Sequence, residues 1–248
     1  MDKVIEGLKT FNLHEYKYIY VYSDLREFGR NILSKEDKYK FLNTLLNELL
    51  HTGSTIVIPS FTYTTSGIFQ MNSTKTHLGA FNNFIQQDIR SVRSEHPLFS
   101  FSAIGPNAEF LKLIGNCSFG NDSVFSRLIG KGTTFLNIGR PISSGNTLVH
   151  YVEDENNAYY RFHKTFNTEV YRGDTYCGMN YSAFLRRRDV SGRTFETEFR
   201  LATEALYSKR KVASFGDPES YLGIFQYDYD DTLDILMELF KSNHEAFI

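Results

Sequence analysis

The sequence has no tryptophan, only two cysteines and five prolines, and no long apolar run. Cys117 and Cys177 supply neither a disulfide framework nor a zinc site, so we expect a reduced, cytoplasmic compartment. No stretch approaches the roughly 20 apolar residues of a membrane helix. We therefore expect no membrane-spanning helix and no membrane as a partner. The first turns of the chain also lack the apolar core and the small-residue cleavage site of a signal peptide.

Positive and negative charges are also nearly balanced. The chain has 27 Lys and Arg against 29 Asp and Glu, a formal net charge of −2. Dedicated nucleic-acid binders are usually basic, so we expect no nucleic acid as a partner. No H-E-x-x-H, clustered cysteines or helically spaced histidine pair points to a metal, and neither a P-loop nor a G-x-S-x-G elbow occurs. The sequence has no repeat, linker or break in composition, which predicts a single domain over residues 1–248.

The N-terminal residues have the pattern of a β-α-β unit. Apolar runs at 18–23 and 55–59 predict buried strands. Between them, Ser34 is expected to cap a helix whose leucines recur at helical spacing until Gly53. Parallel strands in such a unit end at one edge of the sheet, where α/β proteins bind ligands. Further strands are predicted at 97–105, 133–139 and 221–226, and further helices at 107–114, 147–157, 195–209 and 231–241.

Residues 127–132, RLIGKG, match the short pyrophosphate-binding pattern of Gcn5-type acetyltransferases. That pattern requires a helix beginning inside the motif, so that helix amides can meet a phosphate. A helix over 132–142 would support a Gcn5-type enzyme. The apolar run at 133–139 instead predicts a strand, so we interpret the motif as a β-turn.

His150 is the histidine with the most suggestive neighbours. Thr147, His150 and Glu153 are spaced by three residues and therefore share one face of the predicted helix. A carboxylate one turn away can orient an imidazole and raise its basicity, which makes His150 a candidate general base. On spacing alone, an amphipathic helix with a polar face is the simpler explanation.

Arg186, Arg187 and Arg188 form the sharpest charge feature of the sequence. They are either a solvated edge or a site for a phosphate or carboxylate. Acidic residues gather at 153–155 and 228–231. These are most simply solvated helix N-termini, and the alternative is an acidic lining for a cationic substrate.

Six short motifs, in order along nearly the whole chain, resemble those of the aminoglycoside 3-N-acetyltransferase family. They are Tyr22-Ser23-Asp24-Leu25, Pro59-Ser60-Phe61-Thr62-Tyr63, Gly79-Ala80-Phe81, residues 93–105 beginning Arg93-Ser94-Glu95-His96-Pro97, residues 119–128 beginning Phe119-Gly120, and residues 147–153 followed by Tyr160-Arg161. The resemblance implies an α/β protein of three layers, α/β/α, with a central mixed sheet. It also implies an N-acetyltransferase that uses acetyl-CoA or another acyl-CoA.

The resemblance also assigns roles to individual residues. His150 would take the proton of an amine as its nitrogen attacks the acyl carbon in a ternary complex, Glu153 would hold the imidazole tautomer, and Thr147 would stabilise the oxyanion. Ser144 stands where the family often has Asp or Asn, which leaves open which carboxylate orients His150. The implied coenzyme contacts are Ser23, Asp24, Ser60, Phe61, Thr62, Phe119, Ser123 and Phe125. The implied acceptor contacts are Tyr63, His96, Arg186, Arg187 and Arg188.

The departures from the family bear on the acceptor. The three arginines stand where resistance enzymes carry an acidic stretch, and they would repel a polycationic drug and attract a nucleotide diphosphate. The sequence therefore favours a nucleotide-linked amino sugar of surface-glycan synthesis. One alternative is an aminoglycoside acetyltransferase that confers resistance, and another is a non-catalytic protein that binds CoA or a sugar. Acyl length and oligomeric state stay open, a homodimer included.

Overall fold

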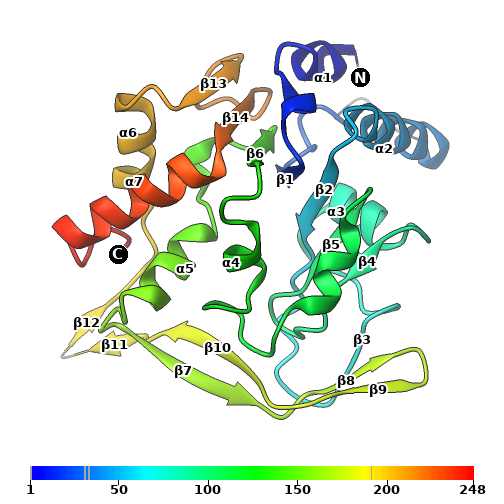
Figure 1. Cartoon of the computed structure of the whole chain (residues 1–248). Coiled ribbons are helices and arrows are strands. Elements are labelled where there is room, and N and C mark those ends of the chain that lie inside the picture. Colours follow the sequence, from blue (N-terminus) through cyan, green and yellow to red (C-terminus); the bar gives the residue numbers. More distant parts are fainter. Residues whose placement is uncertain (1, 31, 33, 191) are drawn as a thin grey trace.

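A computed structural model describes residues 2–30, 32, 34–190 and 192–248. Its centre is a seven-stranded sheet in the order β13-β14-β6-β1-β2-β5-β4 (Figure 1). β1 is parallel to β2 and β6, whereas the outer pairings are antiparallel, so the expected mixed sheet is confirmed. The strand bounds are β1 Tyr18–Ser23, β2 Thr55–Pro59, β4 Val92–Arg93, β5 Phe101–Ile104, β6 Thr133–Ile138, β13 Val212–Phe215 and β14 Ile224–Asp228.

Helices cover both faces of this sheet, which confirms the three-layer α/β/α architecture. Alternation along β1 sends Ile19 and Val21 to one core and Tyr20 and Tyr22 to the other. The first core is closed by α1 Asp2–Leu8, α2 Lys35–Leu50 and α3 Ala80–Gln86. The second is closed by α4 Val124–Leu128, α5 Leu148–Glu155, α6 Arg200–Ser208 and α7 Tyr229–Ser242.

The predicted β-α-β unit is confirmed. The Ser34 hydroxyl accepts a hydrogen bond from the Asp37 amide at 2.9 Å, so it caps α2. Leu45, Leu46 and Leu49 are fully buried against the sheet. Because β1 and β2 run parallel, Ser23 and Pro59 end at the same edge, as expected for a ligand-binding edge.

Several predicted elements begin later than expected. The strand predicted from residue 97 starts at Phe101, because the amides of Leu98 and Phe99 donate to the His96 ring instead of to a neighbouring strand. The helix predicted from 195 starts at Arg200, since the Glu198 amide is bound to the Phe247 carbonyl. The segment predicted as a helix at 107–114 is the 3-10 helix η2 Ala108–Leu113. The strand predicted at 221–226 is β14, which begins at Ile224 and ends at Asp228.

The remaining strands lie beyond one end of the central sheet (Figure 1). β7 Arg161–Phe166 follows directly after α5 and pairs antiparallel with β10 Tyr181–Arg186. Since β8 and β9 lie between them in the chain and also pair antiparallel, β7 and β10 are the base of one long hairpin, which we call the β7–β10 hairpin. β3 Ile68–Gln70, β8 Glu169–Arg172 and β9 Thr175–Gly178 form a small sheet, and β11 Asp189–Val190 pairs with β12 Arg193–Thr194. The other short helices are η1 Leu13–Glu15 and η3 Ile142–Ser144.

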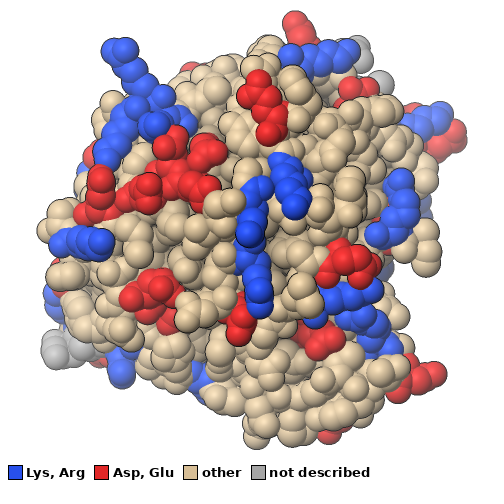
Figure 2. Space-filling view, in the orientation of Figure 1, with Lys and Arg blue, Asp and Glu red and all other residues tan. Residues whose placement is uncertain are grey.

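The RLIGKG motif begins with the last two residues of α4, Arg127 and Leu128, and its remaining residues form the turn before β6. Gly130 and Gly132 have φ of 65° and 67°, and β6 begins at Thr133, which confirms the predicted strand and removes the basis of the Gcn5-type alternative. Within the described ranges, no helix combines the length and apolarity that a membrane crossing requires. On the face seen in Figure 2, basic and acidic side chains are interspersed, in keeping with the nearly balanced charge.

Candidate active site

The start of α5 is tied to the carboxyl end of β1. The Tyr22 hydroxyl accepts a hydrogen bond from the Thr147 amide at 3.0 Å and donates to Asn146 Oδ1 at 3.0 Å. The Leu148 amide donates to the same Asn146 oxygen at 2.9 Å. These bonds satisfy first-turn amides that would otherwise lack a partner. They fix where α5 begins and therefore where its next side chains point.

Tyr22→Phe is expected to destabilise the protein by about 1–3 kcal/mol, because it strips a buried partner from the Thr147 amide and from Asn146. Urea unfolding monitored by circular dichroism measures the change. Tyr39→Phe, at a side chain that is 60% exposed, is the matched control and should be neutral. An unchanged midpoint for Tyr22→Phe would show that this hydroxyl does not hold α5.

A buried charged unit lies one turn further along α5. His150 Nδ1 is 2.7 Å from Glu153 Oε2, and Glu153 is fully buried. Arg161, the first residue of β7, places Nε 2.7 Å from the same carboxylate oxygen and Nη2 2.8 Å from His150 Nδ1. His150 Nδ1 cannot both donate a hydrogen bond to Glu153 and accept one from Arg161. We assign the proton of the neutral imidazole to Nδ1, which donates it to the Glu153 carboxylate. Nε2 is then the ring nitrogen that can accept a proton.

The electrostatics keep this unit in the state that a base requires. Burial lowers the pKa of His150, and the nearby charges of Arg161 and Arg186 lower it further against the opposing effect of Glu153. Burial by itself would raise the pKa of Glu153, but its hydrogen bond to His150 and the charge of Arg161 lower it overall. At neutral pH, a neutral imidazole therefore lies against a carboxylate and a guanidinium.

Sequence reasoning noted Arg161 without giving it a role. It also left open which carboxylate orients His150, and the geometry assigns this position to Glu153. Ser144 lies in η3, where its carbonyl accepts a hydrogen bond from Arg140 at 2.6 Å. Arg161 additionally donates from Nη1 to the Phe184 carbonyl of β10 at 3.1 Å, so the β7–β10 hairpin positions it.

Three of the predicted coenzyme contacts, Phe119, Ser123 and Phe125, lie in the loop and short helix next to the His150 ring. The ring of Phe119 meets the His150 ring edge-on, with centroids 5.8 Å apart, and packs against Phe125. Both phenylalanines are buried. The Ser123 hydroxyl caps α4 and donates to the Gly120 carbonyl at 2.7 Å. In this structure they shape the loop under the imidazole.

Three other predicted coenzyme contacts, Ser60, Phe61 and Thr62, follow β2 and make hydrogen bonds or aromatic contacts with other residues of the chain. The Ser60 hydroxyl donates to Ser102 Oγ at 2.8 Å, and Phe61 is buried among aromatic rings. The Thr62 hydroxyl donates to the Pro97 carbonyl at 2.5 Å. Their present role is to hold the loop that follows β2.

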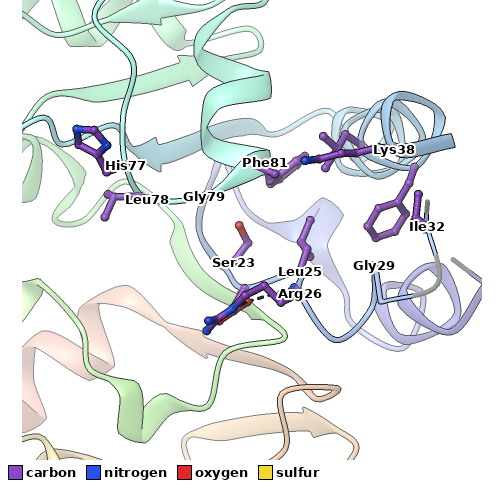
Figure 3. A pocket seen from close by; sticks show the side chains of 14 residues that line it. Ser23, Leu25, Arg26, Gly29, Ile32, Lys38, His77, Leu78, Gly79 and Phe81 are labelled. Carbon is purple, nitrogen blue, oxygen red and sulfur yellow. Dashed lines mark hydrogen bonds and ion pairs between the residues drawn. The ribbon is translucent and has the colours of Figure 1, made fainter. Parts of the chain in front are cut away.

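Ser23 and Asp24 do line a cavity. It has a volume of about 520 Å³ and lies beyond the carboxyl end of β1, between α2 and α3. Asp24 accepts from Arg26 Nε at 2.9 Å, and this hydrogen bond lowers the pKa of Asp24. Figure 3 shows Lys38 extending from α2 on one side of the cavity and Arg26 lying on the other, with His77 nearby on the segment before α3. Basic groups thus border this cavity.

The predicted acceptor contacts separate into different environments. Arg186 pairs with Arg161 in the hairpin register and donates to Thr197 Oγ1 at 2.7 Å, so it lies beside the His150 unit. Arg187 stacks on Phe162, and Arg188 is exposed. Tyr63 is exposed at the end of the β2 loop.

His96 is enclosed rather than open to a ligand. It is 2% exposed, its Nε2 donates to the Ser182 carbonyl at 2.9 Å, and its Nδ1 accepts two backbone amides. Burial lowers the pKa of His96 to about 4, which keeps the ring neutral. Its contacts are those of a residue that holds the 96–100 loop.

A family model described as aminoglycoside 3-N-acetyltransferase matches residues 21–221, a range that contains every residue of the His150 unit. The chain belongs to the aminoglycoside 3-N-acetyltransferase family. Members of this family are N-acetyltransferases, so acyl transfer to an amine is the chemistry of the chain's family. No curated protein matches the chain.

Solved structures of aminoglycoside acetyltransferases have the same fold. Apo AAC(3)-IVa matches with a TM-score of 0.72 at 19% identity, covering 99% of this chain and 89% of that one. AAC-VIa bound to sisomicin matches at 0.73 and 17%, covering 97% of each chain. AAC-IIIb with CoASH matches at 0.76 and 14%, covering 96% of this chain and 95% of that one. At these identities the likeness confirms the expected fold.

Proposed function

We propose that the protein transfers an acyl group from an acyl-coenzyme A to a primary amine of an aminoglycoside-type amino sugar, with His150 as general base. The observation that carries this proposal is the buried His150–Glu153–Arg161 unit, in which Nε2 is left to accept a proton. A protonated amine has no lone pair, so attack on a thioester needs such a base. Family membership supports the reaction type and the aminoglycoside acceptor.

Each member of the unit has a distinct task. His150 Nε2 takes the proton that the amine loses as its nitrogen bonds to the acyl carbon. Glu153 holds the Nδ1 proton and stabilises the imidazolium that results, while Arg161 compensates the buried carboxylate. Thr147, half-buried at the start of α5, would stabilise the developing oxyanion. When bound, the acyl-coenzyme A supplies the activated carbonyl and a thiolate leaving group.

We assign the polar part of the acyl-coenzyme A to the 520 Å³ cavity. Lys38, Arg26 and His77 supply basic groups for a pyrophosphate. Alternation along β1 places Tyr22 against the start of α5 and Ser23 in the cavity. The proposed donor site and the proposed base therefore lie on either side of one strand end. Acetyl-CoA is the expected donor.

Lys38→Ala is expected to raise the KM for acetyl-CoA roughly 2- to 12-fold, as for the loss of about 0.5–1.5 kcal/mol of hydrogen bonding, with kcat unchanged. Lys40→Ala is the matched control, because Lys40 pairs with Glu36 outside the cavity. Initial-rate kinetics at varied acetyl-CoA provide the measurement. Equal KM values for the two variants would place the donor phosphates elsewhere.

A nucleotide-linked amino sugar is the second candidate acceptor, favoured by the position of Arg186 beside His150. The sequence-based preference for it relied on three arginines acting together. Arg187 is instead stacked on Phe162 and Arg188 is exposed at the end of the hairpin, which weakens that preference.

Thiol release from acetyl-CoA distinguishes these candidates. One panel of amines contains aminoglycosides and the other contains UDP- and dTDP-linked amino sugars, with His150→Ala as the control. Turnover of an aminoglycoside that disappears in the variant supports the proposal. Turnover confined to nucleotide sugars would replace the acceptor, and bound coenzyme without turnover of either panel would favour a non-catalytic protein.

A further inference from the structure

The Glu153 carboxylate makes its contacts through only one of its two oxygens. Oε2 lies 2.7 Å from His150 Nδ1 and 2.7 Å from Arg161 Nε. Oε1 is also buried, and within the described residues it has no hydrogen-bond partner. An ionised carboxylate can accept hydrogen bonds on both oxygens, and a buried polar atom without one is unfavourable. Oε1 therefore needs a donor from the protein around it.

The Tyr160 hydroxyl is a second unpaired group in this part of the interior. Tyr160 is fully buried, and in the part of the chain that the structure describes its hydroxyl has no hydrogen-bond partner either. Burial and the nearby charge of Glu153 raise the pKa of Tyr160, so the phenol keeps its proton. An unpaired donor and an unpaired acceptor thus lie close to each other beside His150.

A tight turn returns Tyr160 towards the end of α5. The Ala158 amide donates to the Glu153 carbonyl at 2.9 Å, and the Arg161 amide donates to the Ala158 carbonyl at 2.9 Å. The Tyr160 carbonyl accepts from the Arg187 amide at 2.8 Å. These backbone hydrogen bonds fix the main chain on both sides of the Tyr160 ring. The hydrogen of its hydroxyl can rotate towards whichever acceptor is near.

We propose that Tyr160 is a positioning residue for the proposed base: its hydroxyl donates to Glu153 Oε1 and holds the carboxylate with Oε2 facing His150 Nδ1. This inference rests on the proposed function and adds a fourth member to the buried unit. The terminal torsion of a glutamate is soft, so one bonded oxygen orients the group poorly. A carboxylate turned away would allow the imidazole proton to move to Nε2, and this tautomer cannot accept the proton of the amine.

The tautomer of His150 provides a test that does not depend on turnover. Nitrogen NMR of isotope-labelled histidine distinguishes the two tautomers, and the His150 signal is the one that His150→Ala lacks. Tyr160→Phe keeps the ring, which packs on Phe195 with centroids 5.7 Å apart. Above neutral pH, the ratio of Nδ1- to Nε2-protonated His150 should fall roughly 2- to 12-fold in this variant, the range expected for one hydrogen bond.

Initial-rate kinetics provides the second readout. In Tyr160→Phe, kcat should fall in proportion to the remaining Nδ1-protonated fraction, with both KM values unchanged. Tyr207→Phe is the matched control. The Tyr207 hydroxyl is also buried without a hydrogen-bond partner among the described residues, but it belongs to α6 and its acidic neighbours are Glu219 and Asp217. This control should change neither the tautomer ratio nor kcat, and urea unfolding checks that both variants fold.

The two readouts separate this inference from the proposed function. An unchanged tautomer ratio in Tyr160→Phe would overturn the positioning role, even if kcat fell, because a merely structural change can lower kcat. Amine turnover by the wild-type protein would uphold the proposed function in that case. A lower ratio, in a protein whose wild type turns over no amine, would support the role of Tyr160 in the buried unit and refute the proposed function.

Discussion

Replacing His150 by alanine should lower kcat/KM for acetyl transfer by about 10²- to 10⁴-fold, the usual contribution of a positioned general base. In the proposed mechanism the imidazole accepts the amine proton through Nε2, and Glu153 could not replace it, since Glu153 is engaged by Arg161. Coenzyme binding should be retained. Thiol release measures the loss, and His244→Ala, at an exposed histidine, is the control. A loss below threefold would remove His150 from the mechanism.

The same reaction should show a characteristic pH dependence. The pKa of His150 is lowered from its ordinary value of 6.5, so the base form dominates at pH 7 and above. Rates should therefore fall only as the pH drops through a value below 6.5. Because Arg161 helps to lower this pKa, the acid limb should move to higher pH in Arg161→Met.

Arg161→Met should also destabilise the folded protein by about 3–5 kcal/mol at pH 7, because it leaves a fully buried carboxylate without its permanent cation. Urea unfolding measures this change. Arg90→Met is the control, since Arg90 and Asp88 form a surface ion pair of small expected value.

The sign of the pH effect provides a second readout. The pKa of Glu153 is lower in the folded state than in the unfolded state. The pairing of Glu153 therefore stabilises the fold fully at a pH above the unfolded-state pKa, and this stabilisation is lost as the pH falls through the folded-state pKa. In Arg161→Met the pKa of Glu153 should rise, and the carboxyl should become neutral at a higher pH. The deficit relative to wild type should therefore shrink as the solution is acidified. A deficit independent of pH would mean that packing, rather than charge, accounts for Arg161.

Local patterns predicted the elements that rest on neighbouring residues. The cap at Ser34, the leucines of α2 and the shared helical face of Thr147, His150 and Glu153 follow from spacing alone. The role of Arg161 does not, because it depends on the turn between α5 and β7 and on the pairing of β7 with β10. Neither feature has a short-range signature.

Motif matching also does not reveal what a residue contacts within the protein. Phe119, Phe125 and Ser123 fall in a family motif that implies coenzyme contacts, and the structure adds that Phe119 packs on the His150 ring and that Ser123 caps α4. Arg186, Arg187 and Arg188 read as one charged patch in the sequence. At the end of a strand, successive side chains diverge, and Arg186 alone of these three, all among the described residues, lies beside His150.

The proposed proton-transfer unit is local in the sequence, since His150, Glu153 and Arg161 come from one helix and the strand that follows it. A cavity of about 370 Å³ is lined by residues 115–122, by Asp154 of α5, by His163 of β7 and by Ser182 and Phe184 of β10. It therefore shares α5 with His150 and β7 with Arg161. A substitution that shifts α5 or β7 would move this cavity wall and the proposed base together, so evolution or design cannot adjust one without affecting the other.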